Sequence, residues 1–392
     1  MGKVKIGALK TLGILGGGQL AAMMSEAAKR LGFKVVILAQ SPDSPAVKLA
    51  DQFFLGSLND RAALSSLADA CDVLTLENEF VDSQLLADLE RSGHCVRPSS
   101  SCLSLIQDKF FQKRELSRQG IPVPRFAEAS SVEEIISTAK KWGGAVMIKK
   151  RRNAYDGRGN AVARSEEEIK SAWEFLKGDA ESLYAEEFCL FEKELAVIVS
   201  VSQNKEAAVY PVAETIQENH VCRAVLVPAS IDEPTAVRAS EIALKAVEGI
   251  GGVGSMGVEL FLRKDGEILV NEISPRVHNS GHYTIEACES SQFDNHVRAV
   301  FDLPLGSAAL KEKAAAMVNL LGIEKGDGIP KGLDEARAVS GASVHLYGKK
   351  ESFPGRKMGH VTALGPNPAE ALKTAQKAAA AIQFGAPSRR SS

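Results

Sequence analysis

The chain has 392 residues, and its 47 Lys and Arg against 49 Asp and Glu give a formal net charge of −2. This length predicts two or three domains, because a single domain usually holds roughly 100–200 residues. A hydrophobic content of 45% and a charged content of 24% are typical of a soluble globular protein. The balanced charge argues against a nucleic-acid-binding protein, in which basic residues would be in clear excess.

The six cysteines are scattered, and no two of them form a C-x-x-C pair. This spacing indicates neither a metal site nor a disulfide framework, so we expect free thiols in a reducing compartment. The longest apolar stretches, such as residues 195–199, are far shorter than the roughly 20 residues that span a bilayer. We therefore expect a cytoplasmic protein with no membrane-spanning segment.

The first part of the chain alternates between short apolar runs and helical periodicity. Strands are predicted at residues 11–15, 34–38 and 72–76, and helices at residues 19–31 and 61–70. Such alternation with short connections is typical of a parallel sheet that is covered on both faces. We expect residues 1–105 to form an α/β, Rossmann-like domain.

The middle part changes character, because helical stretches now alternate with longer runs that suit antiparallel pairing. Helices are predicted at residues 109–119, 132–142, 166–176 and 233–249, and strands at 194–201, 207–211, 258–262 and 268–273. Segregated hairpins and helices indicate an α+β domain. We assign it to residues 106–308, since Pro304 and Gly306 mark a boundary.

The last part of the chain predicts a small β-rich domain at residues 309–385. Its strands are expected at residues 315–321, 342–346 and 360–363, followed by a helix at 368–382. Residues 386–392 are expected to be a disordered tail.

A glycine-rich turn at residues 16–18 lies between the first strand and the first helix. It fits G-x-G-x-x-A, in which glycines let a phosphate approach the N-terminus of the helix. A dinucleotide site also needs an acidic residue at the end of the second strand, where this chain has Gln40 and Ser41. We therefore favour a packing turn, or a loop that touches some other phosphate, over the nicotinamide or flavin site of an oxidoreductase.

Lys149 ends a predicted strand, and a second glycine loop follows it at residues 153–160. Backbone N–H groups of such a loop can fold over phosphates, and Lys149 would add a positive charge. Two alternatives remain. The loop could be a simple β-turn, or residues 149–152 could be a nucleic-acid patch, which the neutral balance of the chain disfavours.

The pair Glu259 and Glu272 gives the most informative inference. Asp265 and Gly266 are a strong signal for a two-residue hairpin turn, and a hairpin closed there places the two glutamates directly opposite each other. Like charges in that position are destabilising unless they are compensated. Mg²⁺ compensates them naturally, because it takes one or two carboxylates together with nucleotide phosphates.

Two other interpretations of the glutamate pair remain open. The carboxylates could share a proton and act as acid and base. They could also be a solvated pair without a role, although Phe261, Ile268 and Val270 are expected to make the same face of the hairpin apolar.

The segment after this hairpin gathers polar side chains, with Arg276, His278, Asn279 and His282 within seven residues. A single histidine is more often structural, but this combination follows a rigid hairpin, where binding residues tend to gather. Arg276, His278 and Asn279 together suit a phosphorylated or otherwise anionic substrate.

Together, the glycine-rich βα unit, the Lys149 strand with its loop and the carboxylate hairpin resemble the ATP-grasp ligases. Residues 155–159, 271–272, 275–282, 291–293 and 354–360 look like the branch of that family that carboxylates an aminoimidazole ribonucleotide in purine biosynthesis. The likeness runs in matching order from about residue 12 to residue 363. The His-Asn-Ser-Gly-His segment is specific to that branch.

The resemblance implies an ATP-grasp fold and an ATP-dependent carbon–nitrogen ligase that uses Mg²⁺ and forms ADP and phosphate by way of carboxyphosphate. It also implies a homodimer whose ligands are 5-aminoimidazole ribonucleotide, bicarbonate and ATP. Lys149, Arg276 and His278 would be catalytic, and Glu259 and Glu272 would bind Mg²⁺. The residues at the family's nucleotide site are Lys109, Lys149, Ala154, Tyr155, Asp156, Gly157, Arg158, Gly159, Asn160, Glu186, Glu187, Phe188, Cys189, Glu194, Gln217, Asn271 and Glu272. The residues at its ribonucleotide site are Tyr155, Asp156, Arg158, Arg276, His278, Asn279, Ser280, Lys349 and Arg356.

Five positions depart from the pattern of that branch, namely Phe80, Ala154, Asn160, Gln217 and Phe353. They bear on single assignments and leave the family resemblance unchanged. The alternatives are another ATP-grasp ligase, such as a formate-dependent glycinamide ribonucleotide formyltransferase, and a non-catalytic nucleotide-binding protein. The latter would tolerate the loss of one glutamate of the hairpin pair, and both are present.

Overall fold

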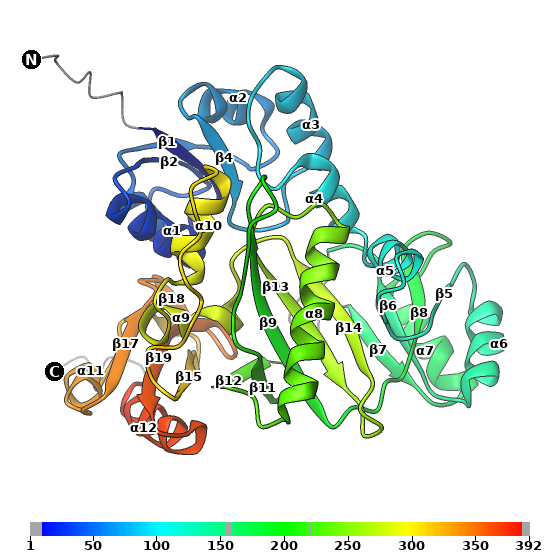
Figure 1. Ribbon diagram of the computed structural model, residues 1–392. Coiled ribbons are helices and arrows are strands. Elements are labelled where there is room, and N and C mark those ends of the chain that lie inside the picture. The colour runs from blue at the N-terminus through cyan, green and yellow to red at the C-terminus, as the bar shows by residue number, and fades with distance from the viewer. Residues whose placement is uncertain (1–9, 154–158, 219–220, 386–392) are drawn as a thin grey trace, which may run out of the picture.

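The computed structural model describes residues 10–153, 159–218 and 221–385. Figure 1 shows a large sheet at the centre, with the N-terminal part above it, a smaller sheet to the right and the C-terminal strands at the lower left. Among the described residues, no helix combines the length and the apolar character that a membrane crossing needs.

The N-terminal part is the parallel α/β unit that the alternation of strands and helices predicts. Its strand order is β3-β2-β1-β4, and all of these pairings are parallel. The prediction missed β3, α3 and α4; β3 is a four-residue edge strand with mostly exposed residues, so no alternation marks it. The elements are β1 (Thr11–Leu15), α1 (Gln19–Arg30), β2 (Lys34–Ala39), the 3₁₀ turn η1 (Pro45–Leu49), β3 (Gln52–Leu55), α2 (Arg61–Asp69), β4 (Val73–Leu76), α3 (Ser83–Arg91) and α4 (Ser100–Gln107).

A smaller antiparallel sheet, in the order β5-β8-β6-β7, carries Lys149. Helices α6 and α7 pack on one of its faces through residues such as Ile135, Ile148 and Ile169. Because side chains alternate along a strand, Lys149 and Glu186 point to the opposite face, toward the large sheet. The elements are α5 (Lys109–Arg118), β5 (Phe126–Glu128), α6 (Val132–Trp142), β6 (Val146–Lys150), β7 (Asn160–Ala163), α7 (Glu166–Leu176) and β8 (Leu183–Glu187).

The large sheet has nine strands, eight of them in the order β14-β13-β9-β11-β12-β15-β19-β17, with β10 also paired to β9. The strands are β9 (Lys193–Val201), β10 (Ala207–Val209), β11 (Ala213–Glu218), β12 (Val221–Val227), β13 (Gly254–Leu262), β14 (Ile268–Ser274), β15 (Ala314–Leu321), β17 (Ala342–Leu346) and β19 (Lys357–Gly365). β15 pairs with β12, so the C-terminal strands continue the central sheet, a connection that the sequence pattern did not predict. The remaining elements are α8 (Glu233–Gly249), η2 (Asn279–Gly281), α9 (Thr284–Ala287), α10 (Gln292–Val300), β16 (Gly326–Asp327), α11 (Leu333–Arg337), β18 (Glu351–Ser352) and α12 (Pro368–Ala381).

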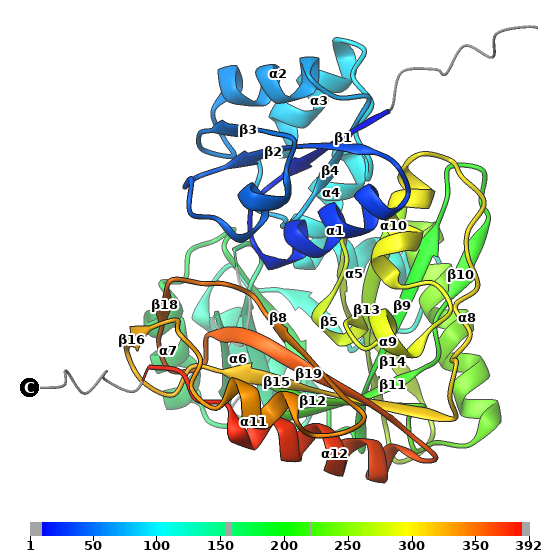
Figure 2. The same ribbon diagram turned by 90° about the vertical axis from the view of Figure 1, so that its left-hand side faces the viewer.

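Helix α10 fixes the N-terminal part to the large sheet, and Figure 2 shows it beside α1. Its Ser291 and Asp294 form a reciprocal capping box, which satisfies backbone donors at the start of the helix. The buried ring of His296 accepts the N–H of Ser255 at Nδ1 over 3.0 Å, so its Nε2 carries the proton that bonds Thr75 Oγ1 at 2.8 Å. One side chain of α10 thus joins β13 to β4.

Candidate active site

Two cavities meet beside the ends of β13 and β14. The first, of about 520 Å³, lies between the small sheet and the large sheet. The second, of about 570 Å³, lies between the N-terminal part and the segment after β18. Five residues line both cavities and therefore mark their junction: Glu79, Arg276, His278, Asn279 and Lys357.

The hairpin of β13 and β14 places Glu259 opposite Glu272, as predicted. The predicted two-residue turn is wrong. Arg263 N–H bonds the carbonyl of Glu267 at 2.9 Å, so three residues close the loop, and Gly266 has φ +84°, which favours glycine. A bulge between Glu259 and Leu260 then shifts the register back by one residue.

The surroundings of Glu259 and Glu272 also differ from the apolar face that the sequence predicts. Ile268 and Val270 pack against α8 on the far face of the sheet, so they do not make the carboxylate face apolar. Of the three apolar residues expected there, Phe261 lines the first cavity. The extra residue is Asn271, and because of it Asn271 and Glu272 both face the cavity.

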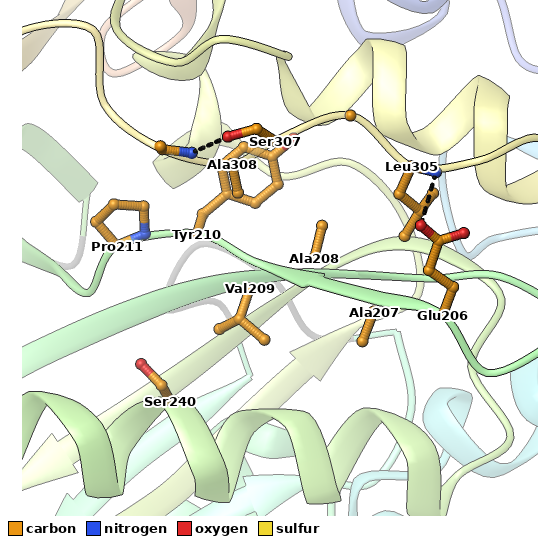
Figure 3. Close-up of a pocket in the computed structure, with 12 residues that line it drawn as sticks. Glu206, Ala207, Ala208, Val209, Tyr210, Pro211, Ser240, Leu305, Ser307 and Ala308 are labelled. Atoms are coloured by element: carbon orange, nitrogen blue, oxygen red, sulfur yellow. Dashed lines mark hydrogen bonds between the residues drawn. The ribbon is translucent and has the colours of Figure 1, made fainter.

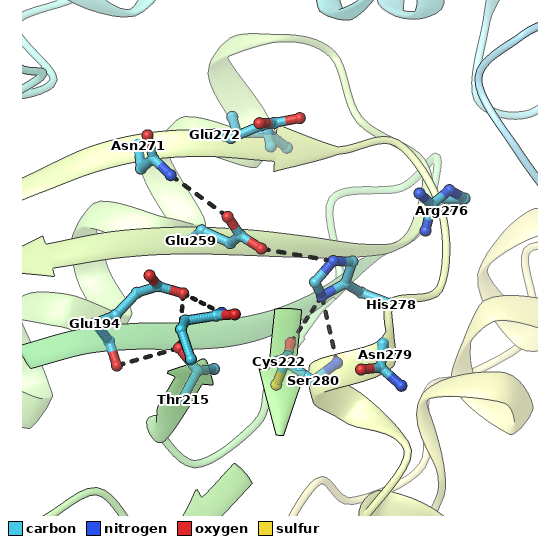
Figure 4. Close-up of polar contacts among 12 residues, drawn as sticks. Glu194, Thr215, Cys222, Glu259, Asn271, Glu272, Arg276, His278, Asn279 and Ser280 are labelled. Atoms are coloured by element: carbon cyan, nitrogen blue, oxygen red, sulfur yellow. Dashed lines mark hydrogen bonds and ion pairs between the residues drawn. The ribbon is translucent and has the colours of Figure 1, made fainter. Parts of the chain in front are cut away.

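The glutamate pair has the chemistry of a Mg²⁺ site (Figure 4). Nζ of Lys109 lies 2.5 Å from Oε2 of Glu272, and Nδ2 of Asn271 donates to Oε2 of Glu259 at 3.4 Å. Burial, and after it the charge of Glu272, raises the pKa of Glu259 to about 8. A divalent cation between the carboxylates would relieve this repulsion. In the described part of the chain, no three His, Cys, Asp or Glu side chains could hold a metal. Because Mg²⁺ takes one or two carboxylates together with nucleotide phosphates, these two carboxylates could hold it.

Lys149 lies on the opposite wall of the first cavity. Its Nζ is 2.5 Å from Oε1 of Glu186, whose Oε2 is 2.9 Å from Nζ of Lys113. Although burial raises the pKa of Glu186, the charges of Lys113 and Lys149 outweigh it, and the pKa lies below its ordinary value. The side chain of Asn160 adds a buried Oδ1 without a hydrogen-bond partner among the described residues, an acceptor free for a ligand.

The far end of the first cavity combines apolar rings with a polar floor. Phe191 stacks on Phe261 at a ring distance of 4.5 Å, and Phe188 and Cys189 lie in the same wall. In the same cavity, Oε1 of Glu194 accepts the hydroxyl of Thr215 at 2.8 Å and an N–H of Gln217 Nε2 at 2.7 Å. An apolar slot beside a fixed carboxylate suits a nucleobase and the hydroxyls of its sugar. Glu187 lies at the rim and pairs with Arg125 and Arg263.

Arg276 and His278 stand at the junction of the cavities. Nε and Nη2 of Arg276 bond the two oxygens of Glu79 at 2.7 and 3.2 Å, which fixes the guanidinium in place. The ring of His278 accepts the N–H of Ser280 at Nδ1, so its Nε2 carries the proton and lies 3.7 Å from Oε1 of Glu259 (Figure 4).

The second cavity is rich in positive charge. Arg276, Lys349, Arg356 and Lys357 line it, and Asn279 is held there by two hydrogen bonds with Asn319, at 2.8 and 2.9 Å. Several cationic groups around one hollow suit a phosphorylated ligand.

The glycine turn at residues 16–18 holds a carboxylate of the chain itself. Oε2 of Glu77 accepts the N–H of Gly18 at 2.9 Å, and a Cβ at position 18 would lie 2.1 Å from Oε1 of the same residue. This carboxylate occupies the N-terminus of α1, where a dinucleotide would place its pyrophosphate. The structure therefore supports the packing turn over the dinucleotide site.

Most predicted site residues come together. Of the described nucleotide-site residues, all except Gly159 line the first cavity. Ser280 lines it too, and Lys349 and Arg356 line the second. Ala154, Tyr155, Asp156, Gly157 and Arg158 lie outside the described residues.

Among the residues that the sequence analysis missed are Glu79 and Lys357, which line both cavities, and Lys113, which pairs with Glu186 behind the first cavity. Glu79 follows the carboxyl end of a parallel strand, which is where ligands bind in such sheets. Lys113 is one helical turn after Lys109, and Lys357 stands within residues 354–360. These sequence positions could have indicated all three residues as candidates for the site.

A further hollow of about 540 Å³ lies between β10 and residues 305–309 (Figure 3). Its one charged lining residue among the described residues, Glu206, already accepts the N–H of Leu305 at 3.1 Å. The hollow therefore lacks convergent polar groups, unlike the two cavities above.

Three protein-family models match successive parts of the chain. The ribonucleotide synthetase preATP-grasp domain matches residues 9–107, the ATP-grasp domain residues 114–293, and the phosphoribosylaminoimidazole carboxylase C-terminal domain residues 315–374. Together they cover most of the residues in the sheets and in the lining of both cavities.

Individual relatives agree with these matches. The chain is 43% identical over 363 residues to N5-carboxyaminoimidazole ribonucleotide synthase of Synechococcus elongatus, covering 92% of this chain and 91% of that one. It is 44% identical over 361 residues to the chloroplastic phosphoribosylaminoimidazole carboxylase of Vigna aconitifolia, covering 90% of this chain and 64% of that relative, just under two thirds of its length. The crystal structure of N5-carboxyaminoimidazole synthase from Aspergillus clavatus in complex with ADP and 5-aminoimidazole ribonucleotide matches with a TM-score of 0.86 and 38% identity, covering 94% of this chain and 97% of that one.

Proposed function

This chain belongs to the N5-carboxyaminoimidazole ribonucleotide synthase family of the ATP-grasp ligases, and we propose how its own residues carry out the family's reaction. That reaction is the ATP-dependent carboxylation of 5-aminoimidazole ribonucleotide in purine biosynthesis. The observation that carries the proposal is the junction of a nucleotide-shaped cavity and a cationic cavity at Arg276 and His278.

The first cavity takes ATP. The slot beside Phe188 and Cys189 holds the adenine, Glu194 binds the ribose hydroxyls, and the phosphates extend toward Lys109 and Lys149. Glu259 and Glu272 hold Mg²⁺, which when bound neutralises phosphate charge. Phosphoryl transfer depends mostly on positioning and charge stabilisation, and these are the groups that the cavity supplies.

The carboxyl group comes from bicarbonate. A bicarbonate oxygen attacks the γ-phosphorus, and the bond from that phosphorus to the bridging oxygen breaks, which gives carboxyphosphate and ADP. The exocyclic amine of the ribonucleotide then forms a bond to the carboxyl carbon, and phosphate leaves with its oxygen and takes up the proton that the amine loses. Arg276, fixed by Glu79, is placed to orient the carboxyl group between the two cavities.

The second cavity takes the ribonucleotide. Its phosphate is bound by Lys349 and Arg356, while Asn279 and His278 face the base. The protonated Nε2 of His278 makes this residue a hydrogen-bond donor at the reacting end. Water must be kept from carboxyphosphate, and the proposed lid is the glycine loop around residues 157–159, most of which lies outside the described residues.

The proposal extends to compartment and assembly. No disulfide joins any of the six cysteines, all of which lie in the described residues, and this supports work in a reducing cytoplasm. The homodimer rests on the family resemblance, and sedimentation equilibrium of the purified chain tests it.

Labelled bicarbonate tests the proposed reaction. Purified protein with ATP, Mg²⁺, 5-aminoimidazole ribonucleotide and ¹⁴C-bicarbonate should fix label into an acid-labile product, with one ADP formed per label. Omission of ATP should abolish fixation. ADP formation that depends on the ribonucleotide without any fixed label would contradict the proposal.

A further inference from the structure

Helix α5 sends two lysines into the site, and the reaction above uses only the first. Lys109 and Lys113 are four positions apart, so they lie one above the other on one face of the helix. Lys109 reaches Glu272, whereas Lys113 reaches Glu186. The side chain of Lys113 is 2% exposed and lines neither cavity, so it touches no substrate.

The carboxylate of Glu186 is shared between two ammonium groups. Lys149 holds Oε1 at 2.5 Å, and Lys113 holds Oε2 at 2.9 Å. Lys113 is anchored further by the carbonyl of Asn271 at 3.1 Å, and the hydroxyl of Tyr184 donates to Oε2 at 3.3 Å. Among the described residues, no other cation pairs with Glu186.

In this structure Glu186 takes one of the three N–H donors of Lys149 and compensates the charge of its ammonium group. To neutralise phosphate, Lys149 has to shift that charge from Glu186 toward ATP. A fully buried carboxylate without a cation is strongly unfavourable, because burial penalises an unpaired charge. Glu186 would therefore retain Lys149 if it had no second partner.

We propose that Lys113 is a positioning residue that keeps Glu186 paired and so frees Lys149 to bind the phosphates of ATP. The inference rests on the proposed role of Lys149. Before ATP binds, the ammonium groups of Lys113 and Lys149 share the carboxylate of Glu186, so the three side chains together carry one net positive charge. After Lys149 turns to the phosphates, a neutral pair of Lys113 and Glu186 remains buried behind the cavity.

The first test replaces Lys113 with methionine, which keeps the length of the side chain and removes its charge. Binding of a non-hydrolysable ATP analogue with Mg²⁺ is measured by titration calorimetry below the unfolding temperature. We expect Kd to rise about 100-fold, because Lys149 is then the only cation left for Glu186. Arg118→Met is the matched control on the same helix, since its side chain is 72% exposed, and it should leave Kd within about twofold.

The second test removes the carboxylate as well. If Lys113 acts through Glu186, then Lys113→Met combined with Glu186→Gln binds the analogue as tightly as Glu186→Gln alone. A role confined to packing would instead move the unfolding temperature of Lys113→Met and leave Kd unchanged, which would overturn the inference. The inference is also overturned if the double variant binds the analogue at least tenfold more weakly than Glu186→Gln. This comparison does not use Lys113→Met alone, so it can be made even if that single variant fails to fold.

These measurements use neither ribonucleotide nor bicarbonate. If no label is fixed but the Kd values of the variants change as predicted, the proposed reaction is rejected and the role of Lys113 is kept. The opposite pattern, with label fixed and Kd unchanged in Lys113→Met, would reject the role of Lys113 alone.

Discussion

At the scale of single residues, the protonation state of His278 decides what it can contribute. Burial, followed by the charges of Arg276 and Lys357, lowers its pKa to about 3. The ring is therefore neutral near pH 7. Because Nδ1 accepts from Ser280, Nε2 is a donor and has no lone pair with which to take a proton from the substrate amine.

Replacement of His278 by glutamine tests this donor role. The amide of glutamine can donate from about the same distance, so His278→Gln should keep kcat within about tenfold of the unchanged protein. His278→Leu removes the donor and should lower kcat by about 100-fold, the cost of an unmade hydrogen bond at the reacting end. Equal losses in the two variants would contradict the assignment.

The carboxylate pair supports a second prediction at this scale. Glu272→Gln removes one of the two charges that hold Mg²⁺, so turnover should fall by at least about 100-fold while the unfolding temperature stays the same or rises. Steady-state ADP release measures the effect. Glu267→Gln is the control, because this residue lies in the same hairpin and half of its side chain is exposed. Near-normal turnover in Glu272→Gln would refute the metal assignment.

At the scale of elements, strand β13 supports the loop that carries His278. Gly257 lies where a Cβ would come within 2.5 Å of the Cβ of His278. An alanine there must push the loop away from the sheet, and reacting groups lose rate steeply when they are displaced by about 1 Å. We therefore expect Gly257→Ala to lower kcat at least about tenfold.

The ATP site lies further along the hairpin and should be largely spared by that change. Titration with the ATP analogue should give a Kd within about threefold of the unchanged protein. A Kd that rises as much as kcat falls would show that Gly257 supports the whole hairpin and not the loop alone.

The same hairpin shows how far the sequence could predict the site. The opposition of Glu259 and Glu272 is confirmed, but the turn has one residue more than predicted and the bulge compensates for it. Turn residues are local signals, so Gly266 marked the turn. A bulge depends on tertiary contacts, here those of Asn271 with Lys149 and Lys113, which no local pattern shows.

Helices were predicted best where a side chain caps them. Helices α6, α7 and α8 begin within one residue of their predicted starts, after Ser131, Ser165 and Asp232, each of which accepts a backbone N–H of its helix. By contrast, β3 is too short and exposed to carry a pattern. Lys113 was missed because its importance comes from a contact with Glu186, which is 73 positions further along the chain.

At the scale of the whole molecule, the near-zero net charge conceals strong local charge. The cationic groups that face the cavities include Lys109, Lys149, Arg276, Lys349 and Arg356, and carboxylates balance them, several of which line the same cavities. A protein that binds ATP and a ribonucleotide therefore need not be basic overall. The domain boundaries at residues 105 and 308 stay a prediction, since the sheet runs on from β12 into β15.

The buried histidines predict how stability depends on pH. Burial lowers the pKa of His278 to about 3, that of His296 to about 4, and those of His282 and His360 well below the ordinary value of 6.5. Below about pH 6.5 the unfolded chain therefore binds more protons at these sites, so acid favours unfolding. Burial raises the pKa of Glu77 and of Glu259, so at these two sites the folded chain binds more protons and acid favours folding. Because four histidines act in the opposite direction, we expect acid to favour unfolding on balance.

The midpoint of thermal unfolding should accordingly be lower at pH 5 than at pH 7. Each net proton changes the free energy of unfolding by up to about 1.4 kcal/mol per pH unit. Calorimetric scans at fixed ionic strength measure the shift. A midpoint that is constant or rises between pH 7 and pH 5 would show that the four histidines do not outweigh the two glutamates, contrary to this prediction.

The central claim is that the two cavities join ATP to the carboxylation of an aminoimidazole ribonucleotide. ADP release, followed with purified protein and Mg²⁺, tests it most directly when two substrate pairs are compared. We predict rapid release with 5-aminoimidazole ribonucleotide and bicarbonate, and only background release with glycinamide ribonucleotide and formate. Release with the second pair alone would contradict the account.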